Sequence, residues 1–574
     1  MVDGMADNLP SAALDSMEKA ALLNASRHGG KADVGAVVSR VLGELPELRA
    51  KAGEVAAEAR RVVQRVNAMG QEGQLSLLSS KYPDATRTKA VEGRVGLPPL
   101  PNAEKGKVTF RIPPEPSGFM HIGHAMAFSI NSLYSQMYQG TLWLRFEDTN
   151  PRKVLPVYYE SFRKGLDWLG IRYDHEKNVS EDNELIYDYG RRLLAEGKAY
   201  ACSCDEAKVK KLRFDGAACE HRDQGPETNL RSWDQMLAKK LGEGSMVIRL
   251  KGDMASVNYA LRDPNIFRII GHEHPITGSR YTVWPTYYMA NTVEDEVCGV
   301  THVLRSSEFQ TELQAAIRAA LGFRHVEIIQ FSRFNFKGTP VHKRLLRPLV
   351  ENGLVSGWDD PRMPTVEGVK RRGILPEAIR EFTLQVGYTK AEHEYDWSLL
   401  LAVNRKLLDP VSKRLFFVPD PVRIEVEGAP RRRVTIPFHP QNDLGSRSIE
   451  TSSSFYISRE DMLALEPGQI FRLMELFNVE PVTKGERPSV RYAGDALIEG
   501  SRKVQWTTPS HSAVELIVPG PLYDEDDRFN EGSLVVRRGF GEEAVGALKA
   551  GEIVQFPRVG FCRLDSTGSF VLAQ

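Results

Sequence analysis

Residues 107–146 constrain the fold more than any other part of this chain. Apolar and polar residues alternate at the start of the segment, as in a half-buried strand, and Pro113 ends the alternation. An apolar run over 121–138 then stops at Gly140, as a helix does, and the alternation returns over 142–146. A strand, a helix and a second strand in this order predict a right-handed β-α-β crossover of a parallel sheet, so we expect an α/β fold.

The start of that helix carries a pattern suited to phosphate. His121, Gly123 and His124 fall in its first turn, after the carboxyl end of a parallel strand, where open α/β sheets bind ligands. The free N–H groups of the turn and the positive end of the helix favour anions. Both histidines lie on one side of the turn and can donate to phosphate oxygens, and the glycine lets a planar base approach the backbone. We therefore predict nucleotide binding rather than two unrelated histidines.

The string His-Ile-Gly-His at 121–124 resembles the signature of class I aminoacyl-tRNA synthetases, and its surroundings resemble the glutamyl/glutaminyl subgroup. Further segments of that subgroup have counterparts in the same order at 145–150 (RFEDTN), 284–291 (WPTYYMAN), 299–305 (GVTHVLR) and 357–365 (GWDDPRMPT). The resemblance begins at about Val108 and covers some four-fifths of the chain. It implies a Rossmann-type catalytic domain that uses ATP with Mg²⁺ as a substrate.

The resemblance also implies the catalytic residues, which are His121, His124 and Lys343. The family's second catalytic loop, of the Lys-Met-Ser-Lys-Ser type, has its counterpart in Val341–Leu345, where His342 occupies a position that is usually Ser. A cation is needed in this loop because charge builds on the departing pyrophosphate, and a solvated basic loop is the alternative. The implied ATP-binding residues are Pro114, His121, Gly123, His124, Lys343 and Arg344.

The choice of amino acid can be argued from charge. A buried side-chain carboxylate needs a charged, preferably bidentate partner, and the resemblance places Arg305 opposite that carboxylate. Glutaminyl enzymes lack an arginine at this position, and an unpaired guanidinium facing a neutral amide is costly, so glutamate is favoured. A structural ion pair is the alternative role for Arg305. The implied glutamate-binding residues are Arg111, Pro113, Glu147, Tyr287, Asn291 and Arg305.

Cys202-Ser-Cys204 and Cys219-Glu-His221 form two close pairs of metal-ligand residue types. Residues two apart in an extended segment point the same way, so each pair can present both ligand atoms to one ion, and Cys₃His is a tetrahedral zinc set. The five cysteines of the chain cannot form a disulfide framework. We predict a structural zinc ion, against the alternative of reduced, partly buried thiols. Some glutamyl enzymes carry a similar site in the insertion that binds the tRNA acceptor end.

Beyond Pro410 the chain consists of short β-prone runs separated by Gly, Pro, Asp and Asn, which is typical of barrels or sandwiches. Segments at 444–447 and 503–506 resemble the glutaminyl-type β-barrels that read the anticodon, whereas bacterial glutamyl enzymes have a helical region there. The resemblance is thus to the archaeal and eukaryotic glutamyl type. Basic clusters are the candidate phosphate contacts for tRNA, although each alone is more often a solvated face. They are Lys370, Arg371, Arg372, Arg431, Arg432 and Arg433.

The first part of the chain, from Ala12 to about Met69, predicts a small helical appendage. This pattern favours an apolar face that closes on neighbouring helices, with binding of a protein partner as the alternative. The apolar residues that recur at steps of three and four are Leu48, Ala52, Val55, Ala59, Val62, Val66 and Met69.

The composition of the chain limits how it can bind nucleic acid and whether it can associate with a membrane. Lys plus Arg and Asp plus Glu each number 75, so the formal net charge is zero and any nucleic acid must be bound through local patches. No apolar run approaches the roughly 18 residues that span a bilayer, and the N-terminus lacks the order of a secretory signal, so we expect no membrane association and a cytoplasmic location.

The predicted organisation places a Rossmann-type catalytic domain between an appendage and β-barrels. The expected parts are a helical appendage with its linker (1–95), the first catalytic half (96–199), an acceptor-end-binding insertion with the zinc site (200–268), the second catalytic half (269–336), a helical connector with the second catalytic loop (337–415) and anticodon-binding β-barrels (416–574).

The expected activity is that of a glutamate–tRNA ligase, which activates glutamate with ATP and transfers it to tRNA(Glu), with tRNA(Gln) left open as a second acceptor. A glutaminyl-tRNA synthetase shares nearly every feature and is the main alternative. A relative that glutamylates a queuosine base lacks anticodon barrels, which the C-terminal strands argue against. A catalytically silent tRNA-binding or assembly protein is disfavoured by the intact string at 121–124.

Overall fold

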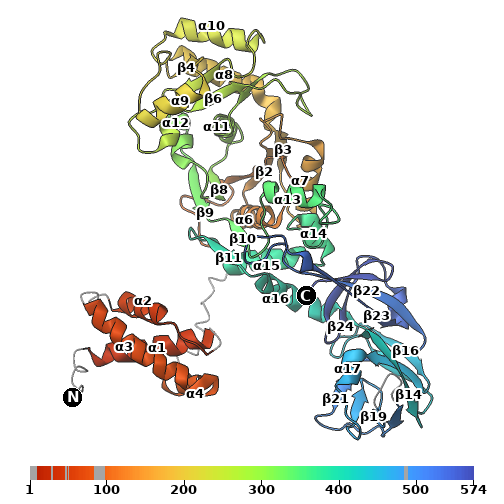
Figure 1. Ribbon diagram of the computed structural model, residues 1–574. Coiled ribbons are helices and arrows are strands. Elements are labelled where there is room, and N and C mark those ends of the chain that lie inside the picture. The colour runs from red at the N-terminus through yellow and green to blue at the C-terminus, as the bar shows by residue number, and fades with distance from the viewer. Residues whose placement is uncertain (1–8, 28–29, 46–47, 49–50, 83–96, 484–488) are drawn as a thin grey trace. The chain divides into compact units, whose positions relative to one another are not determined.

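The computed structural model describes residues 9–27, 30–45, 48, 51–82, 97–483 and 489–574 (Figure 1). The chain divides into two compact units, Met1–Gly96 and Leu97–Gln574. Within the described residues, none of the helices combines the length and the apolar character needed to span a lipid bilayer.

The first unit is helical. It contains α1 (Ser11–Arg27), α2 (Val34–Glu44), α3 (Ala52–Ala68) and α4 (Gly70–Lys81), which share one apolar core. The predicted apolar face of α3 is buried at Val55, Ala59, Val62 and Val66. Its two ends are exceptions, because Ala52 and Met69 are exposed where the helix begins and ends.

The second unit begins with the predicted β-α-β crossover. Strands β1 (Thr109–Ile112), β2 (Thr141–Phe146) and β3 (His175–Asn178) form a parallel sheet in the order β1-β2-β3. Helix α6 (Ile122–Tyr138) connects β1 to β2, and α7 (Pro156–Trp168) connects β2 to β3. The return into β2 requires a glycine, because a Cβ on Gly140 would lie 2.4 Å from the carbonyl oxygen of Val108. The expected α/β class is confirmed.

A second parallel pair extends this layer beyond β1. Strand β8 (His302–Ser306) pairs with β9 (Glu327–Phe331), and Thr301 donates its backbone N–H to the carbonyl of Thr109 at the edge of β1. Helices α11 (Tyr287–Val297) and α12 (Thr311–Leu321) precede and follow β8. The carboxyl ends of β1, β2 and β8 therefore supply one continuous wall.

An antiparallel sheet is inserted after helix α8 (Asn183–Ala195). Its strands are β4 (Ala199–Cys202), β5 (Val247–Leu250), β6 (Asn265–Ile269) and β7 (Val283–Pro285), in that order. Helices α9 (Glu206–Asp215) and α10 (Pro226–Leu237) connect β4 to β5. Because β7 pairs with β6, the sheet continues to Pro285, beyond the limit of 268 expected from the sequence.

Helices follow the catalytic sheet. They are α13 (Lys343–Glu351), α14 (Val366–Arg371), α15 (Pro376–Val386) and α16 (Trp397–Leu408). A short parallel pair, β10 (Phe334–Phe336) with β11 (His393–Tyr395), ties them to the catalytic core. Residues of α14, α15 and α16 pack into the same apolar cluster as α6.

The described C-terminal part, 413–483 and 489–574, is built mainly of strands and contains the short α-helix α17 (Arg459–Leu463). A six-stranded sheet has the order β17-β14-β20-β19-β18-β21 and a seven-stranded sheet the order β12-β24-β25-β26-β22-β23-β13, with β15 and β16 as a separate pair. The buried ion pair Arg447–Glu542 joins β16 of that separate pair to β23 of the seven-stranded sheet. The strands are β12 (Lys413–Arg414), β13 (Phe417–Pro419), β14 (Pro421–Glu427), β15 (Arg432–Pro437), β16 (Ser446–Thr451), β17 (Ser454–Ser458), β18 (Phe471–Leu473), β19 (Asn478–Pro481), β20 (Ser489–Tyr492), β21 (Arg502–Val504), β22 (His511–Pro519), β23 (Leu534–Glu542), β24 (Ile553–Phe556), β25 (Gly560–Ser566) and β26 (Ser569–Leu572).

Candidate active site

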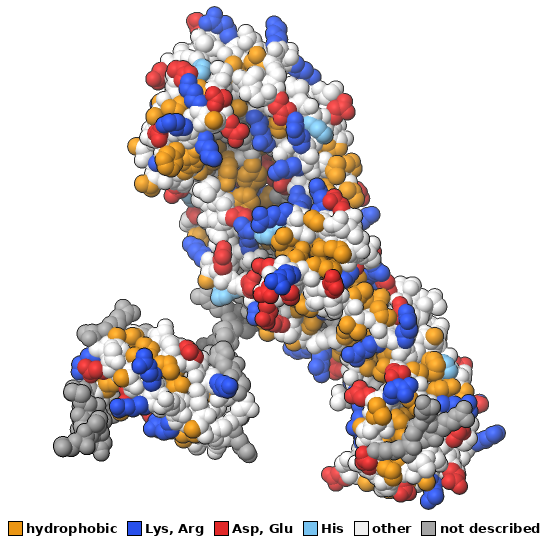
Figure 2. Space-filling model, in the orientation of Figure 1, with side chains coloured by type: hydrophobic (Ala, Val, Ile, Leu, Met, Phe, Trp, Pro, Cys, Tyr) orange, Lys and Arg blue, Asp and Glu red, His pale blue; other side chains and the backbone are white. Residues whose placement is uncertain are grey.

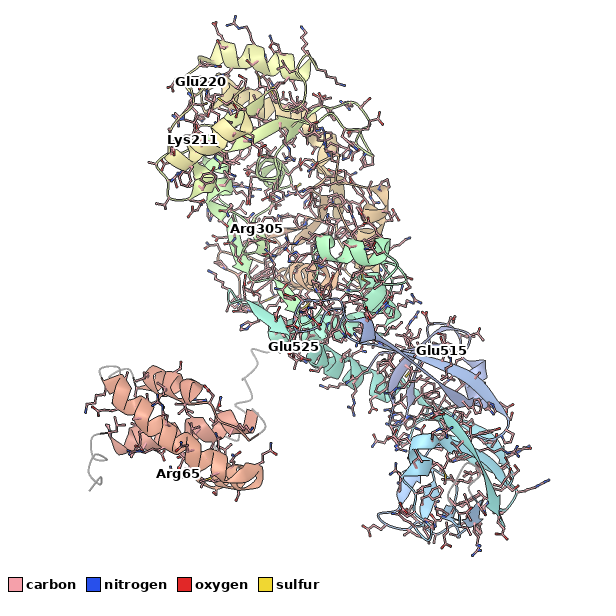
Figure 3. All side chains as sticks on the ribbon, viewed as in Figure 1. Arg65, Lys211, Glu220, Arg305, Glu515 and Glu525 are labelled. Carbon is pink, nitrogen blue, oxygen red and sulfur yellow. The ribbon has the colours of Figure 1, made fainter. Side chains whose placement is uncertain are left out.

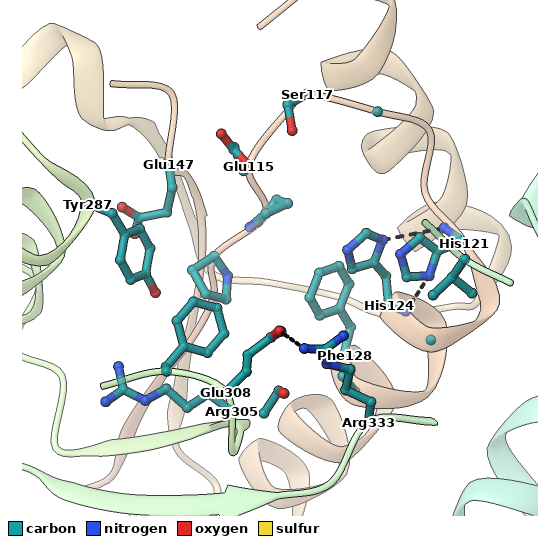
Figure 4. Close-up of a pocket in the computed structure, with 18 of the residues that line it drawn as sticks. Glu115, Ser117, His121, His124, Phe128, Glu147, Tyr287, Arg305, Glu308 and Arg333 are labelled. Atoms are coloured by element: carbon teal, nitrogen blue, oxygen red, sulfur yellow. Dashed lines mark hydrogen bonds and ion pairs between the residues drawn. The ribbon is translucent and has the colours of Figure 1, made fainter. Parts of the chain in front are cut away.

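A cavity of about 660 Å³ opens at the carboxyl ends of β1, β2 and β8, beside the start of α6. This volume suits a nucleotide or a similar small ligand. In Figure 4, the two histidines of α6 lie on one side of the cavity, and Glu147, Tyr287 and Arg305 lie on the other. The predicted ATP-binding and glutamate-binding groups therefore line one space. Those that contribute to its wall are Arg111, Pro113, Pro114, His121, Gly123, His124, Glu147, Tyr287, Arg305 and Lys343.

His121 and His124 form a reciprocal cap on helix α6. The Nδ1 atom of His121 accepts the backbone N–H of His124 at 3.3 Å, and Nδ1 of His124 accepts that of His121 at 3.4 Å. Burial lowers the pKa of His124 to about 4 and the pKa of His121 well below its usual value. Both rings are therefore neutral near pH 7 and carry their proton on Nε2, as donors.

Gly123 is needed for the packing of this turn. A Cβ at this position would lie 3.2 Å from the ring of His121 and 3.5 Å from the carbonyl oxygen of Phe334. Gly123 therefore leaves room for the His121 ring. This role is additional to the close approach of a planar base that the sequence predicted.

Lys343 joins the second catalytic loop to the loop after β1. It is the first residue of α13, and its Nζ donates to the Ser117 hydroxyl at 2.8 Å and to the Ser117 carbonyl. Burial lowers the pKa of Lys343. The neighbouring Arg344 is exposed and does not line the cavity, so the structure separates these two predicted ATP contacts.

Two arginines face the cavity with unused donors. Arg111 donates its Nε–H to Asp295 at 3.2 Å, while its buried Nη1 and Nη2 atoms have no partner in the part of the chain that the structure describes. Among the described residues, Arg305 donates only to the neutral acceptors Gln314 and Thr311, and its Nε has no partner. Burial and the charge of Arg111 lower the pKa of Arg305. Such unpaired guanidinium groups in a cavity favour a ligand that carries carboxylates.

A network of buried charged side chains lies behind the cavity wall and fixes the position of Arg111. Arg145 pairs with Glu147 at 2.8 Å and with Asp295 at 2.9 Å, and Asn291 donates to Glu147 at 3.0 Å. Burial disfavours charge on Asp295, but Arg145 and Arg111 outweigh this effect and hold its pKa below the usual value. Asn291, predicted as a ligand residue, lies behind Glu147 and outside the cavity wall.

Cations that the sequence did not single out also line the cavity. Ion pairing links Arg333 with Glu308, and the Nε of Arg268 on β6 is buried without a partner. Figure 2 shows Lys and Arg side chains around a hollow between the insertion and the catalytic sheet. The cationic lining residues are Arg111, Lys153, Arg268, Arg305, Arg333 and Lys343. Lys153, Arg268 and Arg333 were missed because they lie on separate segments and each resembles an ordinary surface cation in the sequence.

The Cys and His pairs of the insertion meet at the end of β4. The ligand atoms of Cys202, Cys204, Cys219 and His221 all lie within 4.8 Å of one another. Cys204 Sγ lies 3.3 Å from His221 Nδ1, and Cys202 Sγ lies 3.9 Å from Cys219 Sγ. Glu220, which is labelled in Figure 3, separates Cys219 from His221 in the sequence and marks the position of the cluster on the insertion. The donor set fits a tetrahedral ion with four protein ligands.

Four of the six predicted tRNA contacts already engage protein groups. Arg371 pairs with Asp565, Arg432 with Asp495 and Arg433 with Glu450, and Arg372 lies over the ring of Trp397 at 5.4 Å. Burial lowers the pKa of Arg372 to about 10. The side chains of Lys370 and Arg431 are exposed.

Comparison with known proteins assigns most of the second unit to one family. The family model described as class I (E and Q) tRNA synthetases, catalytic domain, matches residues 107–410, and two models for the anti-codon binding domain match 412–492 and 503–565.

Curated relatives extend the match to nearly the whole chain. The glutamate–tRNA ligase of Cenarchaeum symbiosum is 42% identical over 552 residues, which cover 96% of this chain and 97% of that protein. The glutamate–tRNA ligase of Pyrococcus abyssi is 40% identical over 561 residues, covering 95% and 96%. A solved glutamate tRNA ligase of Elizabethkingia meningosepticum in complex with its amino acid has a TM-score of 0.40 and 20% identity, over 53% of this chain and 70% of that one. This chain therefore belongs to the class I (E and Q) tRNA synthetases.

Proposed function

We propose that this protein is a glutamate–tRNA ligase, which uses ATP to activate glutamate and transfers the glutamyl group to tRNA(Glu). The observation that carries the proposal is the placement of Arg111 and Arg305, with unpaired donors, in the same cavity as His121 and His124. Full-length relatives with the same printed activity support it.

In the first step, an α-carboxylate oxygen of glutamate bonds to the α-phosphorus of ATP, and the bond to the pyrophosphate oxygen breaks. His121 and His124 donate Nε2–H to phosphate oxygens, and Lys343 stabilises the charge on the departing pyrophosphate. No protein group has to remove a proton in this step. Mg²⁺ bound to the triphosphate would neutralise further charge, and Glu115 in the cavity wall offers the oxygen ligand that this ion prefers.

In the second step, a hydroxyl of the terminal ribose of tRNA attacks the glutamyl carbonyl and AMP leaves. By family resemblance the attacking group is the 2′-hydroxyl, and glutamate activation needs bound tRNA. The exposed Lys370 and Arg431 are the candidate phosphate contacts left by the pairing of their neighbours, which supports salt-dependent binding through local patches. Charging of tRNA(Gln) with glutamate by the purified protein tests whether this tRNA is a second acceptor.

We also propose a metal ion, a protein partner and a cellular location for this protein. The cluster of Cys202, Cys204, Cys219 and His221 would hold a structural Zn²⁺, which leaves no open coordination position for catalysis. The helical N-terminal unit is a candidate surface for a protein partner. The expected place of action is the cytoplasm.

Aminoacylation by the purified chain tests the proposal. We expect charging of tRNA(Glu) with glutamate, little charging with glutamine, and a rise of ~100-fold in the KM for glutamate in Arg305→Ala, because a buried charge pair is lost. Arg324→Ala, an exposed arginine outside the cavity, is the matched control. Preferred charging of glutamine would support the glutaminyl alternative, and full glutamate activity of Arg305→Ala would refute the specificity argument.

A further inference from the structure

We infer that Gln314 sets the preference for glutamate over glutamine by orienting Arg305 without neutralising it. This inference rests on the proposed function. Gln314 lies on α12 with 1% of its surface exposed, and its Oε1 accepts a hydrogen bond from Nη1 of Arg305 at 2.6 Å. Gln314 does not line the cavity, so it acts through Arg305 as a positioning residue.

The amide of Gln314 can adopt only one orientation. Its Nε2 donates to Oδ1 of Asn291 and to Oδ2 of Asp295, both at 2.9 Å. A flipped amide would place its NH₂ group against the guanidinium of Arg305 and its oxygen against two other oxygens. The network therefore fixes the acceptor that faces Arg305, and through Asp295 it continues to Arg111.

The neutrality of Gln314 matters as much as its position. Arg305 has a second neutral acceptor, the Thr311 hydroxyl at 3.1 Å, and it forms no ion pair with a carboxylate of the described chain. Its positive charge is thus left for a carboxylate of the ligand, apart from its contact with the ring of Phe309. Glutamate supplies a carboxylate for this charge, whereas glutamine would turn the NH₂ end of its amide, or only a neutral oxygen, toward the guanidinium. A carboxylate at position 314 would instead satisfy Arg305 from within the protein.

The test compares Gln314→Glu, which keeps the shape and adds a charge, with Gln314→Met, which keeps the approximate volume and removes the hydrogen bonds. Glutamyl and glutaminyl transfer to tRNA are measured for each, as kcat/KM. We expect Gln314→Glu to lower the glutamate-to-glutamine ratio by at least ~10-fold, because one carboxylate oxygen pairs with Arg305 while the other faces Asn291 and Asp295 without a proton to donate. We expect Gln314→Met to raise the KM for glutamate ~10-fold with kcat within about threefold, because Arg305 loses a charge-assisted hydrogen bond.

The control is Gln385→Glu, the same change at an exposed position on α15, which should leave the ratio unchanged. Thr311→Val, which removes the other acceptor of Arg305, should raise the KM for glutamate about threefold. If a Gln314 variant does not fold, this variant tests whether the neutral acceptors of Arg305 affect glutamate binding. An unchanged ratio and an unchanged KM in the folded variants would overturn the inference. A wild-type protein that charges no glutamate would instead overturn the proposed function.

Discussion

The rings of His121 and His124 stack with their centroids 3.6 Å apart, and each histidine accepts the backbone N–H of the other. Both Nδ1 atoms are therefore occupied, and both Nε2–H groups remain available to the cavity. The pair thus caps α6 and also presents two neutral donors to phosphate, so neither ring can be replaced without loss of one of these tasks.

Replacement of His124 by Asn should reduce glutamate-dependent adenylate formation by ~100-fold or more, because one preorganised donor to the charged transition state is lost. The rate is measured as tRNA-dependent ATP–pyrophosphate exchange. His325→Asn, an exposed histidine away from the cavity, should behave as the wild type. A full rate in His124→Asn would contradict the role assigned to this pair.

Replacement of Lys343 by Ala should lower kcat for the same exchange by ~100-fold, since no other group of α13 reaches the cavity wall. Ser117→Ala removes one of the two acceptors that hold Nζ and should cost less, about three- to tenfold. Arg347→Ala, exposed on the same helix, is the matched control. Equal effects of Lys343→Ala and Arg347→Ala would indicate a general contribution of positive charge instead.

The β-α-β crossover could be predicted from the sequence because apolar periodicity and nearby Pro and Gly residues determine where its strands and helix lie. Helix α6 begins at Ile122 and ends before Gln139, whose backbone is left-handed, close to the expected limits of 121 and 138. In the N-terminal unit, the predicted apolar face was wrong only at Ala52 and Met69, which are exposed at the two ends of α3. Periodicity marks a face, but it does not mark the residue at which the helix ends.

The polar network behind the cavity could not be predicted from its own residues. Asp295 and Gln314 lie on two amphipathic helices, where such residues usually face solvent, yet both are fully buried because they satisfy Arg111, Arg145 and Arg305. Likewise, the sequence places Arg372 in a basic cluster, but in the structure its guanidinium lies over the ring of Trp397. These contacts depend on elements far apart in the chain, and one sequence contains no signal for such pairing.

The Cys and His cluster predicts one bound zinc ion per chain. Metal analysis of the purified protein should give about one equivalent, and Cys219→Ser should reduce it and lower the melting temperature by several degrees, because a structural zinc ion contributes directly to folding free energy. Cys298→Ser, a buried cysteine outside the cluster, should keep the metal. Wild-type protein free of zinc after growth and purification with added zinc would refute the site.

His274 makes a prediction about stability and pH. It lies in the loop between β6 and β7, where its Nδ1 accepts the N–H groups of Ile276 and Thr277 and its Nε2 donates to the carbonyl of Asp148 at 3.0 Å. Burial lowers its pKa from 6.5 to about 4. Between these two values the unfolded chain binds a proton that the folded chain does not, so the stability supplied by neutral His274 is complete above pH 6.5 and is lost as the pH falls toward 4.

Replacement of His274 by Gln, which keeps a donor for the Asp148 carbonyl, should therefore flatten the dependence of the unfolding free energy on pH. The slope between pH 4 and 6.5 should decrease by up to about 1.4 kcal/mol per pH unit, the contribution of one proton. Urea unfolding of both proteins at half-unit steps of pH measures it, and His272→Gln, an exposed histidine of the same loop, is the control. Parallel curves for His274→Gln and the wild type would show that His274 binds its proton equally in both states, and its burial would then not depress its pKa.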